Sequence, residues 1–487
     1  MATFYFSGFL TILNPMAFTK KQYTLAATAL GSSLAFIDAT AVIVALPTIQ
    51  KSLRLGLSGE QWVFLSYSLA LAALYLVGGA LGDRYGHRKM FARGIAGFAI
   101  ASALAGLAPN GVWLITARIL QGVAGAFVTT NSLAWLRRVY EDQAGKAVGL
   151  WTSLTGISTI IAPPLGGALT QWLSWRWIFY INIPLACLVI FWSARAVEDK
   201  TEEIQRPLDI PGALFIAVGL GFLTYFLVEG AKNGFREILW SLLVGLMGLA
   251  AFSATEVRSK NPMLPLQLFK IRNFSMANLE TFLIYGALYG VFVYFTLYLQ
   301  FLGLTPLASS MFLVPTSIVM ILLAAYFGAL SDRIGPRKLL FGGPALIGLG
   351  ALVFSLINSK SDIWLLGTVG IIFFSLGLAM LVAPITTVAL KSAPAKLSGI
   401  ASGFNNTVSR TGSLVVVALV GMVISIIFFD SVTDKSDVPL GIHQTSAGLR
   451  DASQHGYQVG MMIVSAIAFS AAVVGWFGIE NILDTKK

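Results

Sequence analysis

Long apolar segments recur along the whole chain, and they constrain its fold more than any other feature. A helix needs about 20 mostly apolar residues to cross a bilayer. We count fourteen such segments, at roughly 23–47, 61–81, 91–108, 112–135, 145–170, 176–196, 209–229, 236–255, 274–301, 307–330, 338–357, 363–388, 399–429 and 457–479. Because open strands in lipid leave their backbone groups unsatisfied, we predict an all-α polytopic membrane protein.

The composition supports this prediction. Of the 487 residues, 56% are hydrophobic and only 11% are charged, which is more apolar surface than a soluble domain of this length can bury. In the alternative with twelve spans, the segments 209–229 and 236–255 would be surface or re-entrant helices and would not cross the membrane. Both segments are long and nearly uncharged, so we favour fourteen spans.

The net charge of +11 is distributed unevenly between the two sides of the predicted membrane domain. If both termini are cytoplasmic, that side holds 23 Lys and Arg with 12 Asp and Glu, and the opposite side holds 8 and 8. Loops rich in Lys and Arg stay in the cytoplasm. The excess therefore indicates the topology of a multi-pass cell-membrane protein and not a nucleic-acid partner.

The sequence has few of the residues from which disulfides and metal sites are built. Cys187 is the single cysteine and there are three histidines, so we expect neither a disulfide within the chain nor a metal site. No P-loop pattern is present, which argues against ATP as the energy source. The first residues lack a basic segment and make a poor signal peptide, and we hypothesise that Met16 is the true initiator.

One charged motif occurs twice, each time between two apolar segments. It reads GALGDRYGHRK at 79–89 and GALSDRIGPRK at 328–338, an offset of 249 residues. Its glycines permit a sharp reversal of the chain. We therefore predict two tight hairpins, whose key residues are Gly79, Asp83, Arg84, Gly86, Arg88, Asp332 and Arg333.

The repeat also predicts the domain organisation, because motifs at matching places in two hydrophobic halves indicate a duplicated transporter-like chain. Spans one to six correspond to spans nine to fourteen, and spans seven and eight form an insert. The expected parts are a cytoplasmic N-terminus, a six-helix bundle, a linker with two further spans, a second six-helix bundle and a cytoplasmic tail, at 1–22, 23–196, 197–273, 274–479 and 480–487.

With these motifs the chain resembles the major facilitator superfamily, specifically its fourteen-helix drug:proton antiporter branch. Apart from the two hairpins, the likeness rests on LAFIDATAVIVALP at 34–47, RILQGVAG at 118–125, APPLGG at 162–167, WRWIFYINIP at 175–184, DIPG at 209–212 and the pattern SG, NN, R and G within 398–412. The antiporter motif begins with Ala162, where glycine is usual.

The resemblance implies a secondary transporter and not an enzyme. It would export hydrophobic or cationic small molecules in exchange for protons, by alternating access between two bundles. The energy would come from the proton gradient, without a cofactor, and we expect the chain to function as a monomer. The alternative is a proton symporter or facilitator for a metabolite on the same fold. A membrane enzyme or sensor is a weaker third reading, because no cluster of His, Asp and Glu and no soluble output domain is present.

Two charged side chains lie deep within the predicted spans. Asp38 is about 14 residues into the first span, so about 21 Å from its cytoplasmic end. Arg118 enters the fourth span from the outside and reaches a similar depth, which makes a contact between them feasible. An ionised acid at this depth is costly and usually pairs or titrates. We hypothesise that Arg118 holds Asp38 charged in one state and that protonation releases it; a permanent structural ion pair is the alternative.

Further polar residues within the spans are weaker candidates for proton coupling or for lining the substrate cavity. Glu280, which Tyr285 and Tyr289 follow on the ninth span, is a second proton site, a cation-selecting acid, or an acid that snorkels to the interface. Arg410, near Asn405, either lines the cavity or makes hydrogen bonds between helices, and we favour the second. Gln121 and Asn131 complete the cavity candidates.

The fifth span carries small residues and prolines at helical spacing. Gly156, Pro163, Gly166 and Gly167 belong to the predicted antiporter motif. Small residues let two helices approach closely, and proline bends a helix. We predict that the two bundles meet along this face, which we call the seam, and move against each other there. The alternative is that the small residues serve helix packing alone. By resemblance, the charged hairpin motif would form the inner gate, and Asp83 would contact the opposite bundle near Ser398 and Gly399.

Overall fold

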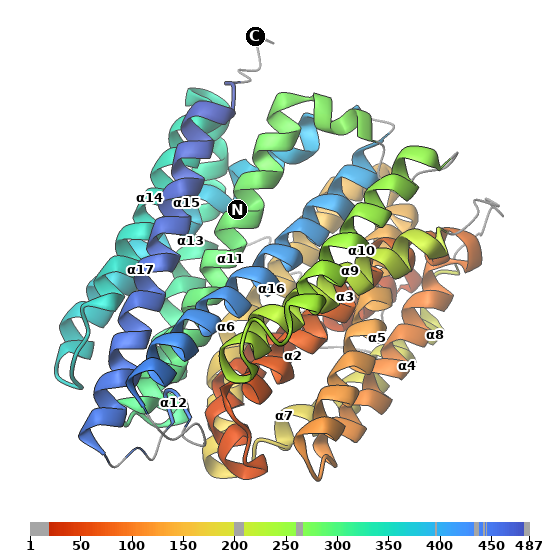
Figure 1. The fold of residues 1–487 in the computed structure, drawn as a ribbon. Helices are drawn as coiled ribbons and strands as arrows, with labels where there is room; N and C mark the ends of the chain where they lie inside the picture. Colours follow the sequence, from red (N-terminus) through yellow and green to blue (C-terminus); the bar gives the residue numbers. More distant parts are fainter. Residues whose placement is uncertain are drawn as a thin grey trace.

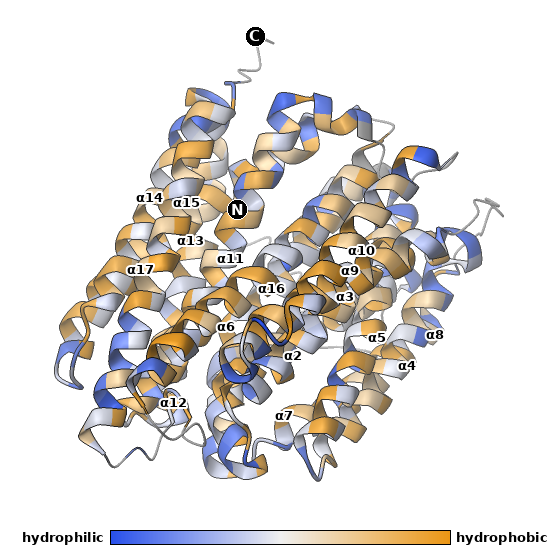
Figure 2. Ribbon diagram, in the orientation of Figure 1, coloured by the Kyte–Doolittle hydropathy of each residue, from blue (hydrophilic) through white to orange (hydrophobic). Residues whose placement is uncertain are grey.

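The computed structural model describes residues 19–198, 209–259, 266–394, 397–432, 438–441, 444 and 446–481. Every regular element in this part of the chain is a helix, as predicted. Figure 1 shows long helices that run roughly side by side, and Figure 2 shows that their middles are mostly hydrophobic and their ends more hydrophilic. The proposed initiator Met16 lies outside the described residues.

The first group of helices follows the order of the predicted first bundle. It consists of α2 (Lys20–Leu53), α3 (Leu57–Tyr85), α4 (His87–Gly106), α5 (Gly111–Val139), the short η2 (Glu141–Gln143), α6 (Ala144–Trp172), α7 (Trp177–Tyr180) and α8 (Asn182–Arg195). Local sequence explains several boundaries. Thr19 and Gln22 form a capping box at the start of α2, and Asn110 caps α5 by accepting from the N–H of Trp113.

The second group has the same helix order. It consists of η3 (Leu266–Lys270), α11 (Arg272–Phe301), α12 (Pro306–Met311), α13 (Val314–Ile334), α14 (Pro336–Ser355), η4 (Ile363–Gly367), α15 (Thr368–Lys391), α16 (Ser398–Ser431) and α17 (Ala447–Gly478). Equivalent neighbours pack in both groups. Helix α3 packs on α5 as α13 packs on α15, and α2 packs on α6 and α8 as α11 packs on α16 and α17.

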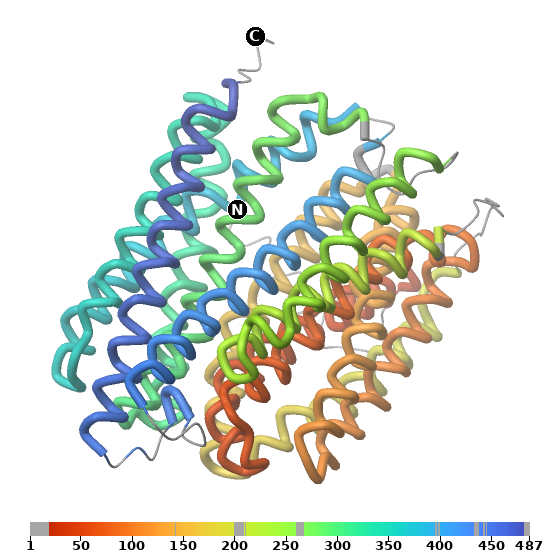
Figure 3. The backbone as a smooth tube through the Cα atoms, viewed as in Figure 1, coloured from red at the N-terminus to blue at the C-terminus, as the bar shows by residue number. Residues whose placement is uncertain are grey.

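Between the two groups lie α9 (Ile210–Asn233) and α10 (Leu239–Arg258), which pack against each other. Helix α9 also contacts α3 of the first group and α16 of the second, and Figure 3 shows this pair of helices lying along them. The indole Nε1 of Trp62 on α3 donates to Glu229 Oε1 on α9 at 3.0 Å. The insert therefore packs on both groups.

Thirteen helical segments of the described chain are long and apolar enough to cross a membrane. They include both segments of the insert, Pro211–Asn233 and Leu239–Arg258, so the reading with twelve spans is not favoured. The predicted span 91–108 is α4, whose first two turns carry Arg88, Lys89 and Arg93 and lower its hydropathy. With α4 included, each predicted span has a helix.

The glycines at the centre of the repeated motif adopt the backbone conformation that the motif predicts. Gly86, between α3 and α4, has φ +91°, and Gly335, between α13 and α14, has φ +81°. Side chains with a Cβ rarely tolerate this conformation. We call the side of the molecule with these two turns, where α2 also begins, the near side, and the opposite side the far side.

Hydrogen bonds between the two groups of helices are found towards the far side. Gln61 Nε2, near the far end of α3, donates to the hydroxyl of Tyr294 at 2.7 Å. Gln300 Nε2 on α11 donates to the carbonyl of Val44 on α2 at 2.8 Å. Gln171, at the far end of α6, accepts from the N–H of Leu307 at 3.3 Å. These bonds hold the far halves of the bundles together.

Candidate functional site

Asp38 of α2 and Arg118 of α5 form an ion pair inside the first bundle, so the predicted contact is present. Arg118 Nη1 contacts Asp38 Oδ2, and both side chains are 0% exposed. Breaking a buried pair by removing one partner costs about 3–5 kcal/mol, because the remaining charge is left uncompensated. The pair therefore fixes the contact between α2 and α5 while Asp38 is charged.

Two side-chain amides complete the environment of the Asp38 carboxylate. Gln121 Nε2 donates to Asp38 Oδ1 at 3.1 Å, and its Oε1 accepts from Arg118 Nη1 at 2.8 Å. Asn182 Nδ2 of α8 donates to the same Oδ1 at 3.0 Å. Ser102 Oγ of α4 accepts from both amides. We name Asp38, Arg118, Gln121, Asn182 and Ser102 the carboxylate network.

Sequence reasoning included Gln121 but missed Asn182 and Ser102. The available signal was Asn182 itself, an amide within a mostly apolar segment and two residues before Pro184. A buried amide requires hydrogen-bond partners, and in a span these come from other helices. The network joins α2, α4, α5 and α8, so a change at Asp38 reaches four helices.

Arg118 has further contacts that hold its guanidinium in place. Its Nε donates to the carbonyl of Val63 on α3 at 3.1 Å, and the guanidinium lies 4.4 Å from the ring centre of Tyr67. A cation over an aromatic face is stabilised by the charge distribution of the ring. The Nη2 atom is buried and has no hydrogen-bond partner. It is the one group here that is free to take a new acceptor.

Glu280 lies apart from the carboxylate network, on α11. It is fully buried, and neither carboxylate oxygen has a hydrogen-bond partner. A Cβ added to Gly475 of α17 would lie 3.2 Å from Glu280 Oε1. Tyr285 and Tyr289 are five and nine residues further along α11, which at 3.6 residues per turn places them on the opposite face. Glu280 and these tyrosines therefore do not line one site, and a proton role for Glu280 stays a prediction.

Arg410 of α16 lies where the two bundles meet. Its Nη1 donates to the hydroxyl of Tyr289 at 3.3 Å, a bond between helices of the kind that we favoured from the sequence. Its guanidinium also lies 5.9 Å from the ring centre of Phe36 on α2. Asn405 donates to Asn278 Oδ1 and Thr281 Oγ1 of α11, at 3.1 and 3.0 Å. Asn405 therefore joins α16 to α11.

At the near side, the first hairpin is held by a charged contact and a buried histidine. Asp83 Oδ1 is 3.1 Å from Arg138 Nη2 at the end of α5 and 3.3 Å from His87 Nε2. His87 Nδ1 is 2.8 Å from Asn131 Oδ1, and Asn131 Nδ2 donates to the carbonyl of Gly78 at 3.0 Å. Asn131 was expected in the cavity, but it holds the hairpin. The predicted contact of Asp83 with Ser398 and Gly399 stays a prediction, because those side chains lie outside what the structure describes.

The second hairpin repeats the contacts of the first. Asp332 Oδ1 is 3.7 Å from Lys391 Nζ at the end of α15, which is the counterpart of α5. Arg88 donates to the carbonyls of Ser193 and Ala194 at the end of α8, and Arg337 donates to the carbonyl of Trp476 at the end of α17. Cations near helix C-termini are favourable. Each motif thus ties four helices of its own bundle together.

The other motif residues have no such role in this structure. The guanidinium of Arg84 lies 5.3 Å from the ring centre of its neighbour Tyr85. Arg333 is an exposed residue in the last turn of α13. A Cβ added to Gly79 would meet nothing within 4 Å. The charged hairpins are therefore organised chiefly by Asp83, Asp332, Arg88 and Arg337.

The predicted seam on α6 is in contact with other helices from its middle to its far end, and at its middle Ser317 Oγ of α13 donates to the carbonyl of Thr159 at 3.2 Å. A Cβ on Gly166 would lie 2.7 Å from Ala41 Cα of α2, and one on Gly167 would lie 2.8 Å from Leu307 Cα of α12. Gly156, towards the near end, would meet nothing within 4 Å. Pro163 and Pro164 lie within a helix that continues to Trp172. In this conformation the far half of α6 touches the second bundle.

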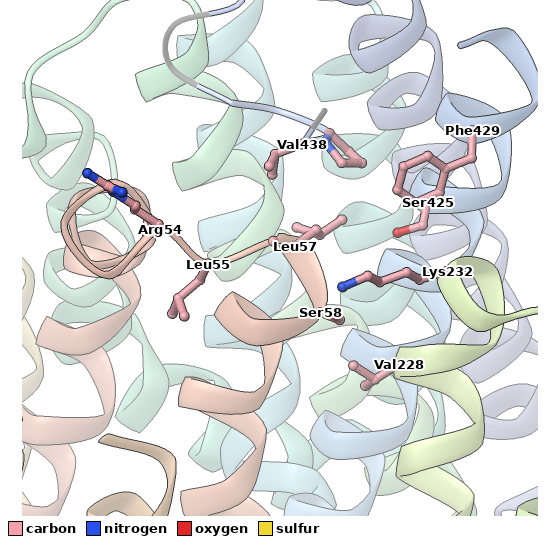
Figure 4. Close-up of a pocket in the computed structure, with 11 residues that line it drawn as sticks. Arg54, Leu55, Leu57, Ser58, Val228, Lys232, Ser425, Phe429 and Val438 are labelled. Atoms are coloured by element: carbon pink, nitrogen blue, oxygen red, sulfur yellow. The ribbon is translucent and has the colours of Figure 1, made fainter. Parts of the chain in front are cut away.

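A pocket of about 320 Å³ lies at the far side, where the α2–α3 turn, α9 and α16 meet. Arg54, Leu57, Lys232 and Phe429 are among its lining residues. Figure 4 shows the Lys232 ammonium pointing into this pocket and the Arg54 guanidinium pointing away from it. No member of the carboxylate network lines it. It is therefore separate from the buried ion pair.

Two helix bundles with equivalent packing, equivalent charged hairpins and a buried ion pair are the features of a membrane transporter. The chain belongs to the Major Facilitator Superfamily, whose family model matches residues 28–417. The resemblance in the sequence is therefore confirmed.

Individual relatives agree with this assignment. The chain is 35% identical over 410 residues to the multidrug resistance protein Stp of Mycobacterium tuberculosis, covering 82% of this chain and 75% of that one. It is 30% identical over 450 residues to the tetracenomycin C resistance and export protein of Streptomyces glaucescens, covering 89% and 82%. A bacterial homologue of the human lysosomal transporter Spinster, solved in an inward-facing conformation, superposes with a TM-score of 0.66 at 17% identity, over 95% of this chain and 97% of that one. The last comparison shows the shared fold.

Proposed function

We propose that this protein exports hydrophobic small molecules from the cell in exchange for protons. The carboxylate network is the observation that carries the proton part of the proposal. It presents one acid, at mid-depth in a span, whose charge is balanced by one arginine and whose oxygens accept from amides on two other helices. The export part is supported by the relatives, which are named for multidrug resistance and antibiotic export.

The mechanism that we propose begins with the near side open. From the positive-inside rule we expect the near side to be cytoplasmic, with both termini there. The far-side bonds Gln61–Tyr294 and Gln300–Val44 then form the outer gate, which is closed in this conformation. The near half of α6 around Gly156 has free space beside it. A substrate would enter from the cytoplasm between the bundles.

Protonation of Asp38 would favour the opposite conformation, in which the far side is open and the near side is closed. A neutral carboxyl group no longer offsets the charge of Arg118, so the ion pair loses its main stabilising term. Arg118 Nη2, which has no hydrogen-bond partner here, could then take a new acceptor. Because the network joins α2, α4, α5 and α8, its rearrangement would move four helices of one bundle against the other. The proton gradient supplies the energy, and a monomer suffices.

The proposal is tested in everted membrane vesicles whose lumen has been acidified. Addition of a transported compound should release lumenal protons, seen as recovery of the fluorescence of a trapped pH indicator, and vesicles without the protein should show no response. Uptake of a metabolite together with protons, without release by any hydrophobic compound, would instead support the symporter alternative. No response to a broad panel of hydrophobic compounds would refute drug export.

A further inference from the structure

Arg410 carries a charge that no acidic side chain in the described chain balances. Its hydrogen-bond partner is the neutral hydroxyl of Tyr289, whereas Arg118 has the carboxylate of Asp38. Three further tyrosines, Tyr67, Tyr75 and Tyr285, lie within electrostatic range of the Arg410 guanidinium. Phenol hydroxyls can donate or accept a hydrogen bond but do not neutralise a cation. The centre of the molecule therefore holds an uncompensated positive charge.

Arg410 lies between the two bundles and is not fully buried as a residue. Arg410 belongs to the second bundle, and the ring near its guanidinium, that of Phe36, belongs to the first. Phe36, Tyr75, Tyr285, Tyr289 and Arg410 are all half-buried, although they lie at mid-depth between the helices. Each of these residues therefore keeps part of its surface accessible.

The surroundings of Arg410 are aromatic. The rings of Phe64 and Tyr289, one from each bundle, have centroids 5.9 Å apart, and Phe292 continues the series at 6.1 Å from Tyr289. Flat apolar rings stack on side chains of this kind. A guanidinium pairs with carboxylates and related oxyanions in two-pronged geometry. The site therefore offers a flat apolar surface and one strong anion-binding group.

The two deep acids that the sequence singled out do not face Arg410. Asp38 is paired with Arg118 inside the first bundle, and Glu280 faces α17 on the other side of α11. The resemblance in the sequence implied hydrophobic or cationic substrates, and the surroundings of Arg410 do not favour the cationic ones. Charge complementarity across a binding site favours ligands of the opposite sign.

We infer that the preferred substrates are aromatic molecules with an acidic group, such as a carboxylate or an ionised phenol, which Arg410 binds between the bundles. This inference rests on the proposed export function and adds the chemical class of its substrate. Arg410 would be the specificity-determining residue, and the rings of Phe36, Tyr289 and Phe292 would bind the body of the molecule.

The test compares two dyes that share one ring system and differ in charge, anionic fluorescein and cationic rhodamine 123. The purified full chain is reconstituted in proteoliposomes, a pH gradient is imposed, and trapped dye is quantified after the vesicles are dissolved at one fixed pH. We expect the wild-type protein to accumulate fluorescein in preference to rhodamine 123. Arg410→Gln should lower fluorescein accumulation about 10- to 100-fold, which is the loss expected for a hydrogen-bonded charge.

Two further variants separate recognition from folding. Arg410→Lys keeps the charge and should retain most of the preference for fluorescein. Lys232→Gln removes a positive charge from the far-side pocket and should change neither dye. Rhodamine 123 accumulation by Arg410→Gln at or above the wild-type rate would show that this variant is folded.

The possible outcomes are distinct. Accumulation of rhodamine 123 but not fluorescein by the wild type overturns the inference without any variant and leaves the export function intact. Undiminished fluorescein transport by Arg410→Gln overturns the role of Arg410, and transport of neither dye also counts against the inference. Failure of the proposed function itself would appear differently, as no proton release with any compound in the vesicle panel.

Discussion

Replacement of Asp38 by asparagine should destabilise the protein more than replacement of its partner Arg118 by glutamine. Both side chains are 0% exposed, so each substitution leaves the other group buried without its counter-charge. A guanidinium keeps its charge in any protein, and Asp38→Asn is therefore expected to cost about 3–5 kcal/mol of the free energy of unfolding. A carboxylate can be neutralised by a proton, so Arg118→Gln should cost less, about 1–3 kcal/mol for lost hydrogen bonds.

The double variant makes this prediction specific to the pair. Asp38→Asn with Arg118→Gln removes both charges and leaves groups that can hydrogen-bond to each other, so it should be more stable than Asp38→Asn alone. The assay is denaturant titration of the detergent-solubilised protein in mixed micelles, with size-exclusion chromatography as a check of the folded state. Costs that simply add in the double variant would refute the reasoning, because contacting residues should show coupling of about 0.5–3 kcal/mol.

Three further predictions follow from individual contacts. Gly82→Ala should destabilise the protein by about 1–3 kcal/mol in the same titration, because its Cβ would collide with the Asn131 and His87 side chains and break their hydrogen bond. Gly79→Ala is the matched control and should have almost no effect, since a Cβ there meets nothing within 4 Å; equal losses would contradict the account of the hairpin. Glu280→Gln should change stability by less than about 1 kcal/mol, because the site offers no partner for a charge, and a loss of several kcal/mol would show an ionised, paired Glu280. Gln61→Leu should weaken the far-side closure and increase labelling of a cysteine placed at the outer end of α3 by a membrane-impermeant thiol reagent; unchanged labelling would show that the Gln61–Tyr294 bond does not hold the closure.

Hydropathy and the repeated motif were sufficient to predict most of the fold. Apolar segments of about 20 residues must be helices in lipid, so their number and order follow from the sequence. The turn glycines Gly86 and Gly335 could be placed because the motif pattern requires a sharp reversal at each. The Asp38–Arg118 pair could be predicted because two opposite charges at a similar depth in lipid have few other ways to be satisfied.

Other side chains could not be placed from one sequence, because a span has several neighbours and its rotation is not known beforehand. Asn131 was expected in the cavity, yet α5 is rotated so that Asn131 faces the hairpin at Gly78 and His87. Glu280 was grouped with tyrosines that lie on the opposite face of α11. Asn182 was overlooked because its role depends on which helices pack against α8. The orientation of each helix is decided by tertiary packing, not by its own composition.

The most direct test of the account is gradient-driven accumulation of a transported compound by proteoliposomes that contain Asp38→Asn. If Asp38 carries the coupled proton, this variant should lose accumulation against a concentration gradient but should still exchange labelled for unlabelled compound when no pH gradient is imposed. Asp38→Glu, which keeps a carboxyl group, should retain part of the accumulation. Accumulation by Asp38→Asn to the wild-type level would contradict the assignment of Asp38 as the proton-coupling residue.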